Sequence, residues 1–236
     1  MGKKKTSKGR RRENARQEFL PGMEERKGKK LGRKPSASSR ASHQAREEFS
    51  SRHPLHVTLK VADGLPSLRG LKAYGVILAA IRESCTRAGR LAEGVFRVVH
   101  YSVQGNHIHL IVEAGDLESL ARGIGGLCTR IAKGLNKLWG RTGKVFPERY
   151  HARVLKTPSE VRNTIRYLYR NAEHHGRNVP PGWADPCTSV IWFDGFEDRR
   201  WSPTGERPVA EPRTWLLMQG YRLAGPLYLG PQPAGA

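Results

Sequence analysis

The sequence has few of the features that mark secreted or membrane proteins. It contains three cysteines in 236 residues. This odd, widely spaced set argues against a disulfide scaffold or a cysteine zinc site, and favours a reducing compartment. No apolar run approaches the ~18 residues that cross a bilayer, and no apolar segment follows the basic N-terminus as in a secretory signal. We therefore expect a cytoplasmic protein of the bacterial type, with no membrane partner.

Positive charge is the main compositional feature. Lys and Arg number 42 against 21 Asp and Glu, a net charge of +21, and only 37% of the residues are hydrophobic. Residues 1–52 are basic and poor in apolar side chains, which predicts a disordered arm. Such an arm on a basic protein favours phosphate backbones, and hence association with the nucleoid. A solvating tail without a specific partner is the alternative, and nothing accompanies the arm that would anchor it to a membrane.

Hydrophobic periodicity predicts one α+β domain over residues 53–178. Strands are expected at 56–62, 95–104, 107–114 and within 145–156, and helices at 71–87, 116–139 and 157–176. The order β-α-β-β-α-β is the split βαβ, ferredoxin-like arrangement, an antiparallel sheet with helices on one face. One more helix follows it. Residues 179–236, rich in Pro, Gly and Trp, are expected to wrap the domain as an extension, with a short helix near 213–223.

Two histidines in the third expected strand are the sharpest chemical feature. Successive side chains of a strand point to opposite faces, so His107 and His109 share one face and Ile108 lies on the other. Two adjacent imidazoles can bind one divalent metal, Mg²⁺ or Mn²⁺, and leave positions open for phosphate oxygens. The plainer alternative is a pair of ordinary surface histidines, since this short motif is weak by itself.

The last expected helix supplies a nucleophile and a further ligand. Tyr167 and Tyr169 border its apolar stripe from opposite sides, and Asn171 lies one turn beyond Tyr167 on the same face. We expect Tyr167 to attack a phosphate while Asn171 completes the metal site. Tyr169, beside charged residues, is expected to be an ordinary half-buried tyrosine. Core packing with a wet hydroxyl is the alternative for either side chain.

Basic residues of the long helix and the segment after it form a candidate track for nucleic-acid phosphates. A solvated helix face is the alternative for each of them. The six candidates are Arg130, Lys133, Lys137, Arg141, Lys144 and Arg149.

Three segments together resemble the Y1 HUH transposases, the IS200/IS605-like proteins and their relatives associated with repetitive extragenic palindromes. They are 106–110 (Asn-His-Ile-His-Leu), 146–154 and 167–171 (Tyr-Leu-Tyr-Arg-Asn). The resemblance implies an enzyme that cleaves and rejoins single-stranded, hairpin-flanked DNA through a 5′-phosphotyrosine on Tyr167. It also implies His107, His109 and Asn171 as metal ligands. Because such proteins can place the tyrosine helix in a partner's site, a homodimer is compatible with it.

Other interpretations stay open. A non-catalytic or domesticated ferredoxin-like nucleic-acid-binding protein would share the fold, as RRM-type sheets do, but the third expected strand carries histidines where an RRM carries aromatics. A HUH relaxase or replication initiator would share the chemistry. The short core and a tyrosine downstream of the histidines favour the transposase arrangement.

Overall fold

The fold is described from a computed structural model, which covers residues 47–90, 96–174, 180 and 183–230. Residues 1–46 of the expected basic arm lie outside these ranges. So does most of the expected boundary between the domain and its C-terminal extension. The arm and both domain boundaries therefore stay predictions.

A four-stranded antiparallel sheet forms the centre of the described part. Its strands are β1 (Leu55–Lys60), β2 (Phe96–Val103), β3 (His107–Ala114) and β4 (His151–Val154). Their order across the sheet is β2-β3-β1-β4, with each neighbouring pair antiparallel. This is the α+β, ferredoxin-like arrangement that the sequence predicts.

Strand β4 lies in the second half of the 145–156 segment, within which the sequence predicts a strand. Before it, Val145 is buried and its carbonyl accepts a hydrogen bond from the Ala62 amide at 2.8 Å. Pro147 then interrupts the chain, since proline has no amide hydrogen to donate to a ladder. The ladder with β1 therefore begins only at His151.

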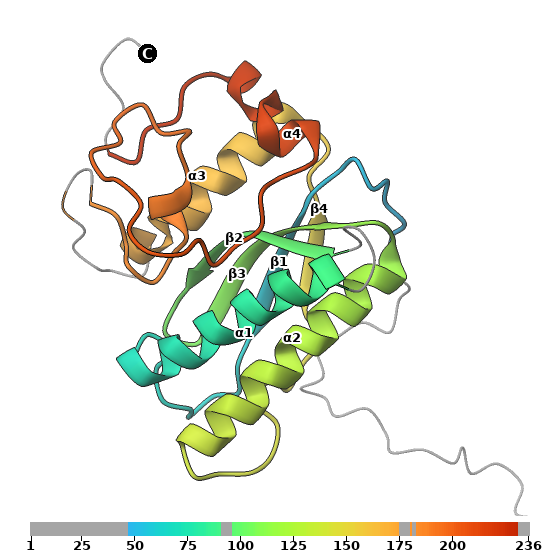
Figure 1. The fold of residues 1–236 in the computed structure, drawn as a ribbon, viewed down its shortest axis with the longest axis vertical. Coiled ribbons are helices and arrows are strands. Elements are labelled where there is room, and N and C mark those ends of the chain that lie inside the picture. The colour runs from blue at the N-terminus through green and yellow to red at the C-terminus, as the bar shows by residue number, and fades with distance from the viewer. Residues whose placement is uncertain (1–46, 91–95, 175–179, 181–182, 231–236) are drawn as a thin grey trace, which may run out of the picture. The chain divides into compact units, whose positions relative to one another are not determined.

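Two helices cover one face of the sheet, α1 (Leu71–Arg90) and α2 (Leu117–Leu138) (Figure 1). Asp116 caps α2 as expected, accepting a hydrogen bond from the Ser119 amide at 2.7 Å. A Cβ on Gly123 would lie 2.2 Å from the Phe96 ring of β2, so this glycine lets the helix approach the sheet closely. The larger apolar core lies between these helices and the sheet.

The other face carries helix α3 (Pro158–His174) and the C-terminal extension (Figure 1). A second apolar core joins them to the sheet, including Ile111 of β3 and Leu168 of α3. The expected short helix near 213–223 forms as α4 (Trp215–Met218) followed by a 3₁₀ turn, Gly220–Ala224.

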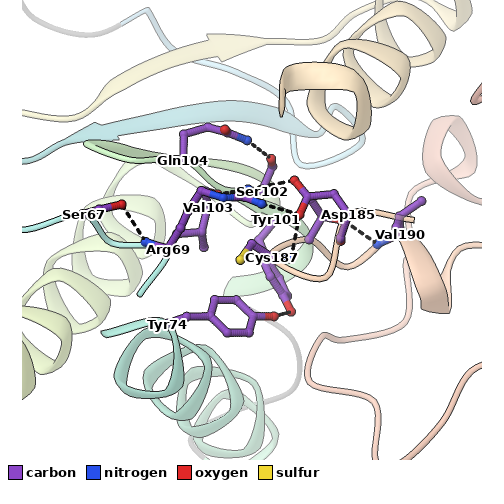
Figure 2. A network of polar contacts seen from close by, with 11 residues as sticks. Ser67, Arg69, Tyr74, Tyr101, Ser102, Val103, Gln104, Asp185, Cys187 and Val190 are labelled. Carbon is purple, nitrogen blue, oxygen red and sulfur yellow. Dashed lines mark hydrogen bonds and ion pairs between the residues drawn. The ribbon is translucent and has the colours of Figure 1, made fainter. Parts of the chain in front are cut away.

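The extension is fastened along the β2 edge of the sheet. Val103 donates its amide to the Cys187 carbonyl at 2.9 Å, and Ser189 donates to the Tyr101 carbonyl at 3.0 Å. Figure 2 shows the ion pair beside these bonds, in which Arg69 holds Asp185 at 2.7 and 2.8 Å. An open strand edge is a template for unwanted pairing, and this segment covers it.

Candidate active site

The candidate site begins with the side-chain alternation of β3. Ile108, Leu110 and Val112 are fully buried in the core beneath α1 and α2. His107 and His109 consequently project from the opposite face, the one that carries α3. The alternation in the sequence predicts this separation.

A bulge in β2 places further polar side chains on the same face. Val98 pairs with Val112 and His100 with Ile111, so Val99 is an extra residue in the ladder. An extra residue in a strand moves each later side chain to the opposite face of the sheet. Beyond the bulge, His100, Ser102 and Gln104 therefore point to the face of the histidine pair, a placement that the sequence does not predict.

One cross-strand row holds four polar side chains at the site. Ser102 pairs with His109, His109 with Thr58, and Thr58 with His151. Next to this row, the backbone amide of Gln104 donates to the backbone carbonyl of His107 at 2.8 Å, and the Gln104 side chain donates to Ser102 Oγ at 2.9 Å. The two histidines thus lie within a polar band that runs across all four strands.

The two imidazoles are adjacent, and each has Nδ1 held by a neighbour. Their ring centroids are 4.7 Å apart. His107 Nδ1 lies 2.8 Å from Asn106 Oδ1, whereas His109 Nδ1 lies 3.1 Å from His56 Nε2 and 3.2 Å from Thr58 Oγ1. Contacts of this kind fix the orientation of a metal-binding imidazole, which then ligates through Nε2.

His56 is a member of the site that sequence reasoning missed. Its ring stacks on that of His109, with centroids 5.2 Å apart. Burial lowers the pKa of His56 to about 4, aided by the nearby His151 and Arg153, so the ring is neutral near pH 7. The alternation of buried and exposed side chains in β1 predicts the sheet face on which His56 lies. Only the pairing of β1 with β3 brings it next to His109.

The two tyrosines of α3 have different surroundings. Tyr167 is 41% exposed, and its ring lies edge-on to His109 of its own chain, with centroids 5.4 Å apart. Tyr169 is 4% exposed, and its hydroxyl lies 2.7 Å from His100 Nδ1 and 3.1 Å from Ser189 Oγ. The expectation of a half-buried Tyr169 among charged residues is wrong, because the extension supplies Ser189 and buries the ring.

Asn171 gives an independent indication of a missing ligand. It is 0% exposed and lies on α3, one turn beyond Tyr167. Within the described ranges, neither its side-chain oxygen nor its nitrogen has a hydrogen-bond partner. A buried amide without partners is costly unless something else satisfies it, and a metal bound to the oxygen would do so.

Two imidazoles and a carboxamide are donor groups that a divalent cation accepts. Among the residues that the structure describes, no three His, Cys, Asp or Glu side chains cluster as metal ligands. A metal site at this place thus depends on an amide oxygen, a ligand that Mg²⁺ and Ca²⁺ accept. Gln104, 1% exposed, presents a second such oxygen without a partner in the described part of the chain.

Comparisons with known proteins bear on the fold. No protein-family model and no curated protein matches the chain. Among solved structures it is similar to a REP-associated tyrosine transposase bound to a REP hairpin, at a TM-score of 0.50 and 16% identity over 73% of this chain and 99% of that chain. The chain has the fold of this transposase. A bacterial tRNA(His) guanylyltransferase (Thg1)-like protein in complex with GTP aligns at a TM-score of 0.36 and 15% identity, over 57% of this chain and 74% of that one. This likeness is too low to support an argument about fold or function.

The six expected phosphate-binding residues differ in how exposed their side chains are. Lys133, Lys137, Lys144 and Arg149 are exposed. Arg130 is half-buried, and its guanidinium donates to Ser84 of α1, so it joins two helices. Arg141 is half-buried, and it donates to Asn136 at 2.9 Å.

Only part of this set lies toward the histidines. The segment after α2 is tied to the end of β1 through the bond between Ala62 and Val145, beside the start of β3. Lys144 and Arg141 therefore lie at the His107 end of the sheet. Arg130 lies about two turns back along α2, on the other side of the sheet.

A hollow beside Tyr167 is lined by cationic side chains that sequence reasoning missed. It has a volume of about 360 Å³ and is bounded by Asn163, Arg166, Tyr167, Arg170 and Glu173 of α3. Arg170 pairs with Glu173 at 2.6 Å. Helical spacing gathers these residues on one face, although the sequence does not say which face stays open.

No helix within the described ranges is both long and apolar enough to cross a bilayer.

Proposed function

We propose that this protein is a DNA transposase that cleaves and rejoins single-stranded DNA flanked by a hairpin. The observation that carries the proposal is the juxtaposition, within one chain, of Tyr167 and His109, whose ring centroids are 5.4 Å apart. The fold shared with a transposase bound to a DNA hairpin supports this class of substrate. A likeness of fold alone does not give a function, so the geometry of the site is the main support.

Tyr167 is the proposed nucleophile. Its phenol oxygen attacks the phosphorus of a phosphodiester, and the new O–P bond forms as the bond from phosphorus to O3′ breaks. The phenol proton is lost to solvent, and the departing O3′ takes up a proton. The products are a 5′-phosphotyrosine and a free 3′-hydroxyl. Because one phosphodiester replaces another, a second 3′-hydroxyl can reverse the step without ATP.

His107, His109 and Asn171 are the proposed ligands of a divalent cation, Mg²⁺ or Mn²⁺. The anchored Nδ1 atoms of both histidines and the buried amide of Asn171 support this assignment. When bound, such a cation polarises the scissile phosphate and takes up charge as the reaction proceeds. The fixed strand and the packed helix keep the two histidines and Tyr167 in register with that phosphate.

Arg166 and Arg170 are proposed to hold the strand that approaches Tyr167. Both guanidiniums line the hollow beside the nucleophile, where they suit the phosphates next to the cleaved bond. Contacts of this kind weaken as salt concentration rises, because DNA binding releases condensed counterions.

The test uses full-length protein and single-stranded hairpin oligonucleotides from the DNA flanking its gene. Each oligonucleotide carries a fluorophore at its 3′ end, because the 3′-terminal fragment stays attached to the protein through its new 5′-phosphate. With Mn²⁺, we expect a labelled band at the protein's position on a denaturing gel. Tyr167→Phe is expected to abolish the band and retain DNA binding, and His107→Ala to abolish cleavage.

Tyr169→Phe is the matched control, since it removes the phenol hydroxyl of another tyrosine only two residues away on α3. We expect this variant to keep the labelled band. A dead Tyr169→Phe beside an active Tyr167→Phe would show that the nucleophile is misassigned. Wild-type protein that binds the hairpins but cleaves none with either metal would instead indicate a non-catalytic binding protein.

A further inference from the structure

We infer that His56 is a positioning residue of the proposed metal site, which sets the orientation and tautomer of His109 without touching the metal. The inference rests on the proposed function and adds a residue to it. Its basis is the contact between His56 Nε2 and His109 Nδ1 at 3.1 Å, together with the stacking of the two rings.

The contact ties the tautomer of His109 to that of His56, because one of the two nitrogens must carry the shared hydrogen. A neutral imidazole has one N–H and one bare nitrogen, and the bare nitrogen is the one that ligates a metal. If His109 ligates through Nε2, its Nδ1 carries the hydrogen and donates it. His56 Nε2 then accepts, which puts the hydrogen of His56 on its own Nδ1. The pair thus selects one tautomer of each ring.

The stacking adds a restraint on the ring itself. The planes of His56 and His109 are inclined by 26°, so His109 lies against a flat neighbour along one face. Tyr167 lies edge-on to both rings, with centroids 6.2 Å from His56 and 5.4 Å from His109. His56 therefore contacts the proposed ligand and borders the proposed nucleophile.

Thr58 is a second neighbour of the same nitrogen, with Oγ1 3.2 Å from His109 Nδ1. Both side chains come from β1 and face the site because β1 pairs with β3 in register. Two polar neighbours from one strand thus contact His109 Nδ1, whereas the His107 Nδ1 contact comes from the adjacent turn residue Asn106.

The experiment is a Mn²⁺ titration of the full-length protein without DNA, with free Mn²⁺ followed by electron paramagnetic resonance. His56→Phe keeps a flat ring and removes both nitrogens. Loss of a partner that orients a metal ligand costs about 10- to 100-fold in metal affinity, and we expect a weakening in this range. His56→Gln restores a polar atom near the Nε2 position and should recover most of the affinity.

His53→Phe is the matched control, since His53 precedes β1 in the same segment and lines a different hollow, with Arg97 and Arg213. We expect its Mn²⁺ affinity to stay within about twofold of wild type. His56→Phe that folds and binds Mn²⁺ as tightly as wild type overturns the inference. Equal losses in His56→Phe and His56→Gln also overturn it, because a hydrogen-bonding role predicts rescue.

His109→Ala separates this failure from that of the proposed function. If His109→Ala leaves the Mn²⁺ affinity unchanged, the proposed metal site itself is wrong and the inference falls with it. If His109→Ala removes binding while His56→Phe matches wild type, only the role of His56 is wrong. Nitrogen-15 NMR of the histidines gives a readout without metal: wild type should show hydrogen on Nδ1 of His109, and a mixture of tautomers should appear in His56→Phe.

Discussion

The attachment of the C-terminal extension to the sheet gives a quantitative prediction about stability. Arg69 holds both carboxylate oxygens of Asp185, at 2.7 and 2.8 Å, and the two side chains are only 9% and 2% exposed. Asp185 also accepts the amide of Cys187 at 3.0 Å. Asp185→Asn keeps the shape and removes the charge, which leaves a buried guanidinium without its counter-ion.

Removal of one partner of a buried ion pair costs about 3–5 kcal/mol. We expect Asp185→Asn to lower the free energy of unfolding by this amount in urea denaturation monitored by circular dichroism. Replacing both partners with apolar residues, Arg69→Met with Asp185→Leu, should recover part of the loss because no charge is then stranded.

Glu47→Gln is the control for this prediction. It removes an exposed ion pair of similar length, in which Lys156 lies 2.8 Å from Glu47. Exposed pairs contribute little, so its urea midpoint should stay close to that of wild type. If Asp185→Asn is no less stable than Glu47→Gln, the buried pair does not hold the extension as described.

Three more predictions concern packing and buried polar groups. Tyr169→Phe should cost about 1–3 kcal/mol in urea denaturation, because it strands the buried His100 nitrogen; an unchanged midpoint would contradict this. Burial lowers the pKa of His100 to about 3, aided by Arg207. Between this pKa and the usual value of about 6.5, His100 is protonated in the unfolded chain and neutral in the folded one. Stability should be full above about pH 6.5 and fall toward pH 4, by up to ~1.4 kcal/mol per pH unit for this group; equal urea midpoints at pH 7 and 5 would refute it. Gly134→Ala should destabilise, because its Cβ would lie 2.4 Å from Val76, whereas Gly125→Ala meets nothing within 4 Å and should stabilise by up to ~1 kcal/mol. Thermal melts of both variants would show opposite shifts, and shifts of the same sign would count against this packing.

The element order and the facing of β3 could be predicted from the sequence because both depend on local periodicity. Ile108 and its alternate neighbours are apolar, and this fixes which face His107 and His109 occupy. The helix bearing Tyr167 carries an equally regular stripe. For these elements, the local sequence pattern is enough to predict the secondary structure and the face on which each side chain lies.

The remainder of the site depends on contacts between distant segments. Nothing in the β2 sequence, FRVVHYSV, marks the bulge at Val99, yet the bulge turns Ser102 and Gln104 toward the histidines. The burial of Tyr169 depends on Ser189 of the extension. His56 reaches His109 only through strand pairing across 53 residues. Periodicity within one segment contains none of this information.

The most direct test of the proposed chemistry is to find which residue carries DNA after the reaction. Adduct formed with Mn²⁺ and a hairpin oligonucleotide would be digested with nuclease and protease, and the modified peptide sequenced by mass spectrometry. The account predicts a nucleotide 5′-phosphate on Tyr167. A nucleotide on any other residue, or one linked through its 3′ end, would contradict it.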